Sequence, residues 1–104
     1  MTTYVLNTPV LTDYGTYRFE RVDLSAAQEM ANGAVSAVGH AGAAEAVSLL
    51  LGRKIQVNRT EISMKPGDVA LVFRVLARLP EGAVLSAEET LALPHEFGRL
   101  ERLA

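Results

Sequence analysis

Residues 57–79 read VNRTEISMKPGDVALVFRVLARL, and this stretch decides the fold that the sequence predicts. Two runs of alternating or apolar residues, at 57–64 and 69–79, flank the tetrapeptide Lys-Pro-Gly-Asp. Pro and Gly at these places favour a tight reversal of the chain. We therefore expect a β-hairpin of two strands with its loop at residues 65–68.

The register of this hairpin predicts which side chains share a face, because side chains alternate across a strand. One face, expected in the core, carries Ile62, Met64, Val69, Leu71, Phe73 and Val75. The other face carries Val72, Glu61 and the cations, with Arg59 directly opposite Arg74 and with Arg78 further along the strand. Like charges directly opposite each other destabilise a sheet, so these guanidinium groups need anions. Two sources of anions stay open: Glu61 and Glu20 at a solvated surface, or a phosphate ligand.

Working outward, the rest of the chain divides into short strands and helices. We expect strands at residues 3–6, 16–22 and 34–38, and a last, edge strand at 97–103. Capping-box patterns begin helices at Ser25 and Ser86, and Gly33 and Gly52 are suited to ending the first and second of three helices. The pattern predicts one domain over residues 1–104 of the α+β class: a mixed sheet of about five strands flanked by short helices.

Composition excludes several classes of protein. The chain has 104 residues, 49% of them hydrophobic, a net charge of -2, no cysteine and two histidines. We therefore expect no disulfide, no thiol chemistry, no cysteine- or histidine-rich metal site and no cofactor. The apolar runs are shorter than the ~20 residues of a membrane-spanning helix, and the first residues do not resemble a signal peptide. The acidic balance argues against direct DNA binding.

His40 stands out because it precedes a run of small residues at the expected start of a helix. A helix N-terminus presents unpaired N–H groups that favour an anion, and the small side chains let a phosphodiester approach the backbone. Histidine titrates near neutrality and can donate a proton to a leaving oxygen. The alternative is a polar residue near a helix cap with no further role. His95 has no such setting, and we expect it at the surface.

Four segments of the sequence together resemble a small viral family. They are YVLNTPVLTDYGTYRFE at 4–20, SAVGH at 36–40, VNRTEI at 57–62 and RLPEGAVLSAEE at 78–89. The resemblance is to the anti-CRISPR ring nucleases of archaeal viruses and bacteriophages, which have homologues in bacterial type III CRISPR loci. It covers nearly the whole chain in the same order.

The resemblance implies a homodimer that binds cyclic tetra-adenylate across its two-fold axis. It also implies metal-independent cleavage of that ring into linear di-adenylates ending in 2′,3′-cyclic phosphate, in the cytoplasm of the host if the protein is viral. Such cleavage switches off type III CRISPR signalling. Two other functions stay open: a cyclic-oligonucleotide-binding protein without turnover (a sponge), and a small viral nucleic-acid-binding dimer.

The resemblance also implies roles for individual residues. The family histidine falls on His40, the expected general acid, and a family glutamate falls on Glu81, which either orients His40 or contacts a ribose. Some members have a serine where this chain has Gly42, so only a backbone N–H serves there; at Arg74 at least one member has Gln. The full set of expected ligand-binding residues is Asn7, Thr8, Gly39, Ala41, Gly42, Arg59, Arg74 and Arg78, with no metal ligand, and residues 8–15 are the candidate loop that closes over the ligand.

Overall fold

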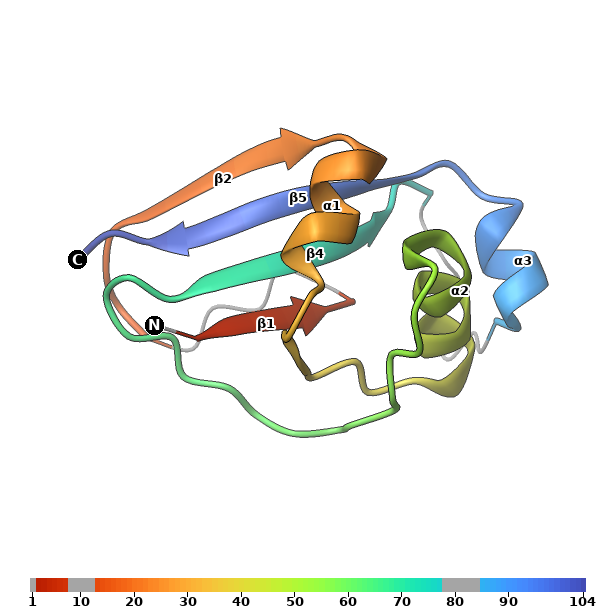
Figure 1. Cartoon of the computed structure of the whole chain (residues 1–104), viewed down its shortest axis with the longest axis horizontal. Helices are drawn as coiled ribbons and strands as arrows, with labels where there is room; N and C mark the ends of the chain where they lie inside the picture. Colours follow the sequence, from red (N-terminus) through yellow and green to blue (C-terminus); the bar gives the residue numbers. More distant parts are fainter. Residues whose placement is uncertain (1, 8–12, 78–84) are drawn as a thin grey trace.

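The structure of the chain is a computed structural model that describes residues 2–7, 13–77 and 85–104. Its elements, in chain order, are β1 (Thr3–Leu6), β2 (Tyr17–Val22), α1 (Leu24–Met30), β3 (Val35–Ser36), α2 (Ala41–Leu51), β4 (Val69–Val75), α3 (Ala87–Leu91) and β5 (His95–Arg102). The expected α+β class is confirmed, with a mixed five-stranded sheet and short helices (Figure 1).

The sheet has the strand order β2-β5-β4-β1-β3. β1 runs parallel to both β3 and β4, whereas β5 runs antiparallel to β2 and β4. The carboxyl ends of β1, β3 and β4 therefore meet at the same edge of the sheet. Figure 1 shows α2 beside this edge, α3 outside α2, and α1 lying across the sheet.

The helix boundaries follow local chemistry. Ser86 and Glu89 form the expected capping box of α3, and Gly52 ends α2 in the left-handed conformation, with a φ of 67°. The capping box expected at Ser25 is wrong: the N-cap of α1 is Asp23, whose side chain accepts a hydrogen bond from the N–H of Ala26 at 2.8 Å. A carboxylate caps a helix as well as a hydroxyl does, so the N-cap lies two residues before the expected one and α1 begins at Leu24. Because the C-cap of α1 is Ala31, Gly33 (φ 75°) lies beyond it in the following turn.

Two clusters of buried side chains hold the sheet, one on each face. The first joins α1 and α2 to Leu71 and Phe73, and also includes Val5 and Phe97. The second contains Ala70 and Val72 together with Leu6, Met64 and Leu100. All five residues from Val69 to Phe73 are buried, which is typical of a strand covered on both faces. β4 is therefore the centre of the fold.

The predicted hairpin between residues 57–64 and 69–79 is wrong. β4 already pairs with β1 on one side and β5 on the other, and a strand can pair with only two neighbours in a sheet. The chain before the turn instead forms a single parallel bridge, Val38 to Val57, and then covers the second face of the sheet. Met64 is buried there beside Ala70 and Val72, on the opposite face from Leu71 and Phe73. The turn itself is confirmed, because Asp68 N–H donates to Lys65 O at 2.9 Å.

Three other expectations change with the topology. The last strand begins at His95 rather than at residue 97, and it is an inner strand between β2 and β4 rather than an edge strand. β3 is an edge strand of two residues with Val35 half-exposed. His95 is half-buried rather than at the surface, because it pairs with Val75 and its ring centroid lies 5.5 Å from that of Phe73.

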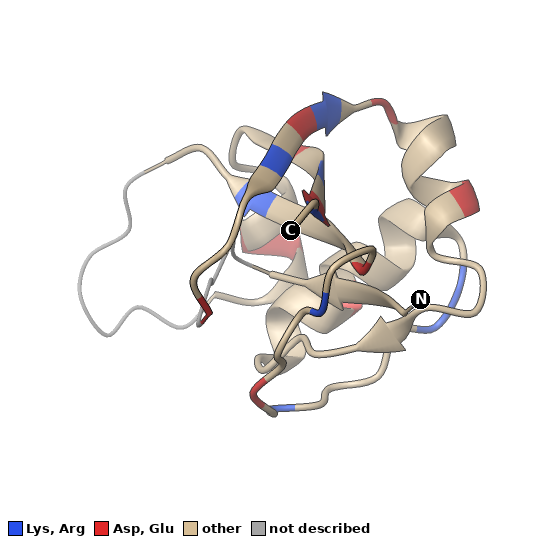
Figure 2. Cartoon of the chain, turned by 90° about the vertical axis from the view of Figure 1, so that its left-hand side faces the viewer, with Lys and Arg blue, Asp and Glu red and all other residues tan. Residues whose placement is uncertain are grey.

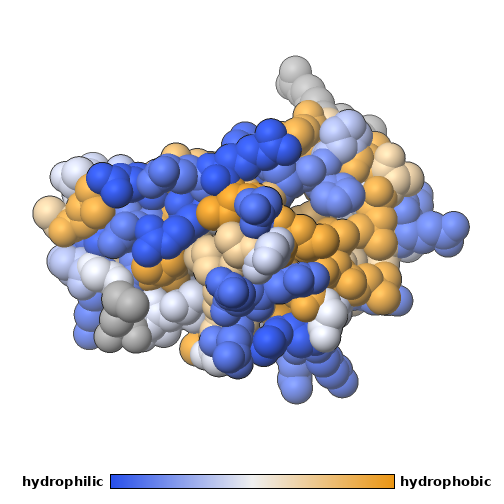
Figure 3. Space-filling view, turned by 45° about the horizontal axis from the view of Figure 1, so that its top comes forward, coloured by the Kyte–Doolittle hydropathy of each residue, from blue (hydrophilic) through white to orange (hydrophobic). Residues whose placement is uncertain are grey.

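Surface character differs between the two halves of the molecule. In Figure 3 the strand-bearing half is largely hydrophilic, and the larger apolar area lies over the helices. Leu49 of α2 and Leu24 of α1 are among the exposed apolar residues. Within the described residues, no helix has the length and apolar character needed to cross a membrane.

Candidate functional site

His40 is the N-cap residue of α2, as the sequence predicts. Its backbone is extended (φ -126°, ψ 134°), its side chain makes no capping hydrogen bond, and it is exposed. An N-cap side chain usually accepts a hydrogen bond from the first turn. Here the imidazole is not used in this way and is exposed, at the end of the helix where the first N–H groups have no partner within the helix itself.

The first turn of α2 carries no acidic residue. Ala41, Gly42 and Ala43 leave their backbone N–H groups uncovered by long side chains, and no carboxylate in that turn cancels the positive end of the helix dipole. The charge at this terminus does not oppose an anion, and the ligand contacts expected at Gly39, Ala41 and Gly42 stay predictions.

Arg59 lies against Gly39, directly before His40. A Cβ built on Gly39 would be 3.3 Å from Cγ of Arg59 and 3.7 Å from its Cα. The stem of the arginine therefore passes close to the backbone of Gly39, where a side chain would crowd it. The structure thus places Arg59 against Gly39, the residue before His40, although residues 57–64 do not form the expected strand.

Gly42 has a different reason for being small. A Cβ built there would lie 2.0 Å from the carbonyl oxygen of Leu85 and 3.3 Å from the carbonyl carbon of Ser86. The chain that enters α3 is therefore pressed against the first turn of α2. Gly42 is required by this contact.

Asn7 leaves the sheet at the same edge as His40. It directly follows β1, and Ala37 N–H donates to Val5 O at 2.9 Å, which extends the parallel pairing of β1 with the chain after β3. Ligands of open α/β sheets bind outside the carboxyl ends of parallel strands. Asn7 is half-buried and is placed at this edge with the His40 segment.

Arg74 does not lie opposite Arg59, which corrects the expected register. It pairs across the sheet with Glu96 of β5, and its Nη1 is 3.3 Å from Glu96 Oε1. Its Cζ lies 5.7 Å from the centroid of the Phe19 ring. Glu96 also binds Arg21, at 3.4 Å. The Arg74 charge is therefore already engaged on the β2–β5–β4 side of the sheet.

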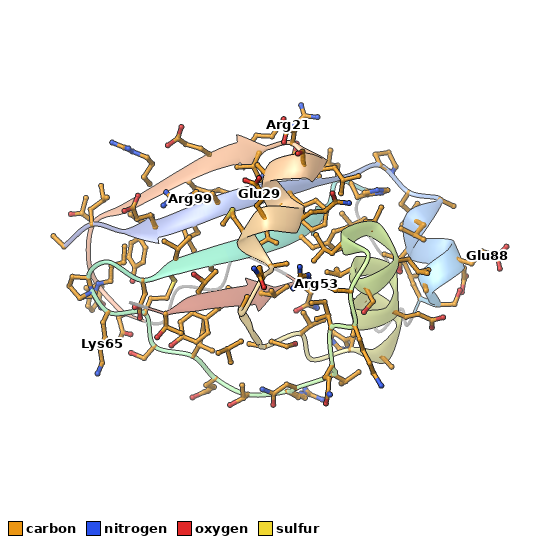
Figure 4. All side chains as sticks on the ribbon, viewed as in Figure 1. Arg21, Glu29, Arg53, Lys65, Glu88 and Arg99 are labelled. Atoms are coloured by element: carbon orange, nitrogen blue, oxygen red, sulfur yellow. The ribbon has the colours of Figure 1, made fainter. Side chains whose placement is uncertain are left out.

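The charges on β2 and β5 neutralise one another. Figure 2 shows basic and acidic positions alternating along β2, where Arg18 and Glu20 are 3.6 Å apart. On β5, Arg99 and Glu101 pair at 2.8 Å. Figure 4 places Arg21 and Arg99 on these strands and Glu88 on the outer side of α3. In contrast, Arg59 has no carboxylate within 4.0 Å among residues 2–7, 13–77 and 85–104.

Thr8, Arg78 and Glu81, which were expected to contact the ligand or to assist His40, lie outside the described residues. The same is true of residues 8–12 of the expected closing loop. In the part of the chain that the structure describes, no group of three or more histidine, aspartate and glutamate side chains has a metal-binding arrangement.

Sequence reasoning assigned no role to Ser36 and Asn58. Asn58 Nδ2 donates to Ser36 O at 2.7 Å, and Ser36 Oγ donates to Gln56 O at 2.6 Å. Both residues lie in segments that carry the family resemblance, SAVGH and VNRTEI, and Asn58 directly precedes Arg59. The available signal was a short polar side chain directly before Arg59 and another within the SAVGH segment that ends at His40.

Comparison with known proteins gives the family. A sequence profile described as STIV B116-like matches residues 3–97. The chain belongs to the STIV B116-like family. Its relatives in this family include the ORF117 protein of Acidianus two-tailed virus, which is 40% identical over 95 residues that cover 85% of this chain and 81% of the relative.

Two further relatives extend the comparison. The ORF116 protein of Acidianus filamentous virus 1 is 34% identical over 55 residues, which cover 53% of this chain and 47% of that protein. The solved structure of B116 of Sulfolobus turreted icosahedral virus has a TM-score of 0.74 and 24% identity, and the match covers 98% of this chain and 100% of B116. The family is thus represented in archaeal viruses, and its fold extends over almost all of this chain.

Proposed function

We propose that this member of the STIV B116-like family is a ring nuclease that binds cyclic tetra-adenylate and cleaves it without a metal. The observation that carries the proposal is the position of His40: exposed, unused as a cap, at the N-terminus of α2 and next to Arg59. The sequence resemblance to anti-CRISPR ring nucleases supplies the substrate.

The chemistry needs few protein groups, because the ligand supplies its own nucleophile. A ribose 2′-oxygen forms a bond to phosphorus, the bond from phosphorus to the 5′-oxygen breaks, and the 2′-hydroxyl proton passes to solvent. His40 gives a proton to the departing 5′-oxygen. General acid catalysis of this kind is typically worth ~10²–10⁴-fold in rate.

Arg59 and the N–H groups of the first turn of α2 stabilise the phosphate. Arginine donates two hydrogen bonds in a fixed plane, which matches the oxygens of a phosphate. Backbone N–H groups at a helix terminus are held in position before the reaction, so they stabilise developing charge without rearrangement. The N–H groups follow His40 directly in the chain, and the stem of Arg59 lies against Gly39, which precedes it.

A two-fold homodimer completes the site. Two copies of His40 related by a two-fold axis would act on opposite phosphates of a ring of four nucleotides, and two cuts would give two equal dinucleotides. The dimer also doubles the number of Arg59 side chains that face the phosphates.

Product analysis tests the proposal. Cyclic tetra-adenylate and cyclic hexa-adenylate are incubated with the protein in EDTA, and the products are separated by chromatography and weighed by mass spectrometry. We expect linear di-adenylate with 2′,3′-cyclic phosphate from the tetra-adenylate ring. Recovery of an intact but tightly bound ring would identify a sponge instead, and absence of binding would exclude both functions.

A further inference from the structure

The segment that carries Arg59 is tied to the strand that leads to His40 by side chains as well as backbone. Ser36 Oγ donates to Gln56 O at 2.6 Å, and Asn58 Nδ2 donates to Ser36 O at 2.7 Å. Between these contacts, Asn58 N–H donates to Val38 O at 2.8 Å. The two segments therefore exchange hydrogen bonds on both sides of the Val38–Val57 bridge.

These contacts fix the residue immediately before Arg59. Asn58 is held at its backbone N–H and at its side-chain amide, each by a backbone carbonyl of the residues 36–38. The next residue then follows the line of the bridge and meets Gly39, with Cγ of Arg59 3.3 Å from where a Cβ on Gly39 would be. Residues 58–61 are exposed and belong to no strand, so these hydrogen bonds are what holds the segment in place.

We propose that Asn58, together with Ser36, is a positioning residue that holds the stem of Arg59 against Gly39, the residue before His40, before ligand binds. The inference rests on the proposed function and deepens it. The stem of Arg59 lies against Gly39, directly before His40, and it is long and flexible. A charge that is placed in advance stabilises a transition state better than one that must be moved into place, and a misplacement of about 1 Å costs a large factor in rate.

The amide of Asn58 is suited to this role, and close substitutes are not. An aspartate would bring a carboxylate oxygen against the carbonyl oxygen of Ser36, with no hydrogen to share. A leucine would keep the approximate size and remove the donor. The structure also offers a matched control: Asn32, whose Oδ1 accepts a long hydrogen bond of 3.4 Å from Arg53 in the turn after α1.

The kinetic experiment compares single-turnover cleavage of saturating cyclic tetra-adenylate by wild type, Asn58→Leu and Asn32→Leu. We expect Asn58→Leu to lower the rate by ~10–100-fold and Asn32→Leu to leave it within twofold of wild type. In an Arg59→Ala background, adding Asn58→Leu should lower the rate by less than twofold, because a residue that acts through Arg59 has nothing left to position. If the rate loss of the double variant were the product of the losses of Asn58→Leu and Arg59→Ala, the proposal would be overturned. An unchanged rate in Asn58→Leu would also overturn it.

A second measurement does not depend on activity. In the free protein, a nuclear Overhauser contact between the Arg59 γ-methylene and the Gly39 α-protons is expected in wild type and in Asn32→Leu and should disappear in Asn58→Leu. If wild type does not cleave the ring, the proposed function fails, whereas this contact still tests the placement of Arg59. Persistence of the contact in a folded Asn58→Leu variant would refute the positioning role.

Discussion

Asp68 is buried in the turn before β4, and its carboxylate joins the two ends of that turn to the start of the chain. Oδ1 accepts from Thr2 N–H and Oδ2 from Lys65 N–H, each at 2.9 Å. These backbone hydrogen bonds lower the pKa of Asp68 below its usual value of 3.8, although burial opposes them. The charged form therefore stabilises the fold.

The Asp68→Asn variant should lose about 1–3 kcal/mol of stability at pH 7, because one N–H is left facing an amide donor. A carboxyl with a depressed pKa contributes stability that is fully present above its unfolded pKa and is lost as pH falls through the folded value. The difference in melting temperature between wild type and Asp68→Asn should thus shrink as pH falls from about 4 toward 2.5. A difference that stays constant over that range would contradict this account.

Gly42 links the candidate site to α3. The Gly42→Ser variant places a Cβ at the Leu85 carbonyl oxygen, 2.0 Å away, so the backbone at the start of α3 must move. We expect a loss of about 1–3 kcal/mol, typical of overpacking, measured by thermal or denaturant unfolding. Ala41→Ser, at an exposed position one residue earlier, is the control and should change stability little. Equal stabilities of the two variants would show that this contact is absent in solution.

At the scale of elements, the sequence predicts most strands and helices but misplaces the partner of β4. Alternation and turn residues locate β1, β2, the Lys65–Asp68 turn and the Ser86 capping box, because each depends on neighbouring residues. The pairing of residues 57–64 depends on what else competes for β4. The uninterrupted apolar run VALVF at 69–73 was the signal for a strand covered on both faces, and such a strand leaves no edge for a hairpin partner.

In the candidate site, too, features set by neighbouring residues could be predicted and features set by strand order could not. His40 at a helix start is predictable from the small residues after it. The neighbours of Arg59 and Arg74 are not, because they depend on the strand order. A wrong register joined these two arginines, and the observed topology separates them, leaving Arg59 with Gly39 and Arg74 with Glu96.

The corrected topology predicts which core residues are energetically coupled. Met64 packs with Val72 on the second face, whereas Leu71 belongs to the opposite cluster. Met64→Ala should cost about 2–5 kcal/mol. A double-mutant cycle by chemical denaturation should give coupling of about 0.5 kcal/mol or more between Met64→Ala and Val72→Ala, and near-additivity with Leu71→Ala. The reverse pattern would support the hairpin that the structure excludes.

At the scale of the whole molecule, the charge of the chain matters. One chain has a net charge of -2, and the arginines of β2, β4 and β5 that the structure describes, Arg18, Arg21, Arg74 and Arg99, are paired with carboxylates. In the proposed function, the tetra-anionic ring is held by cations from two chains. We expect light scattering to give twice the monomer mass of 11.2 kDa, and calorimetry to give one ring bound per two chains. A monomer that binds one ring would contradict the two-fold arrangement.

The most direct measurement is single-turnover cleavage of cyclic tetra-adenylate in EDTA by wild type and His40→Ala, with ring binding measured on the same samples. The account predicts that His40→Ala binds the ring as tightly as wild type and cleaves it at least ~10²-fold more slowly. Cleavage by His40→Ala at the wild-type rate would contradict it.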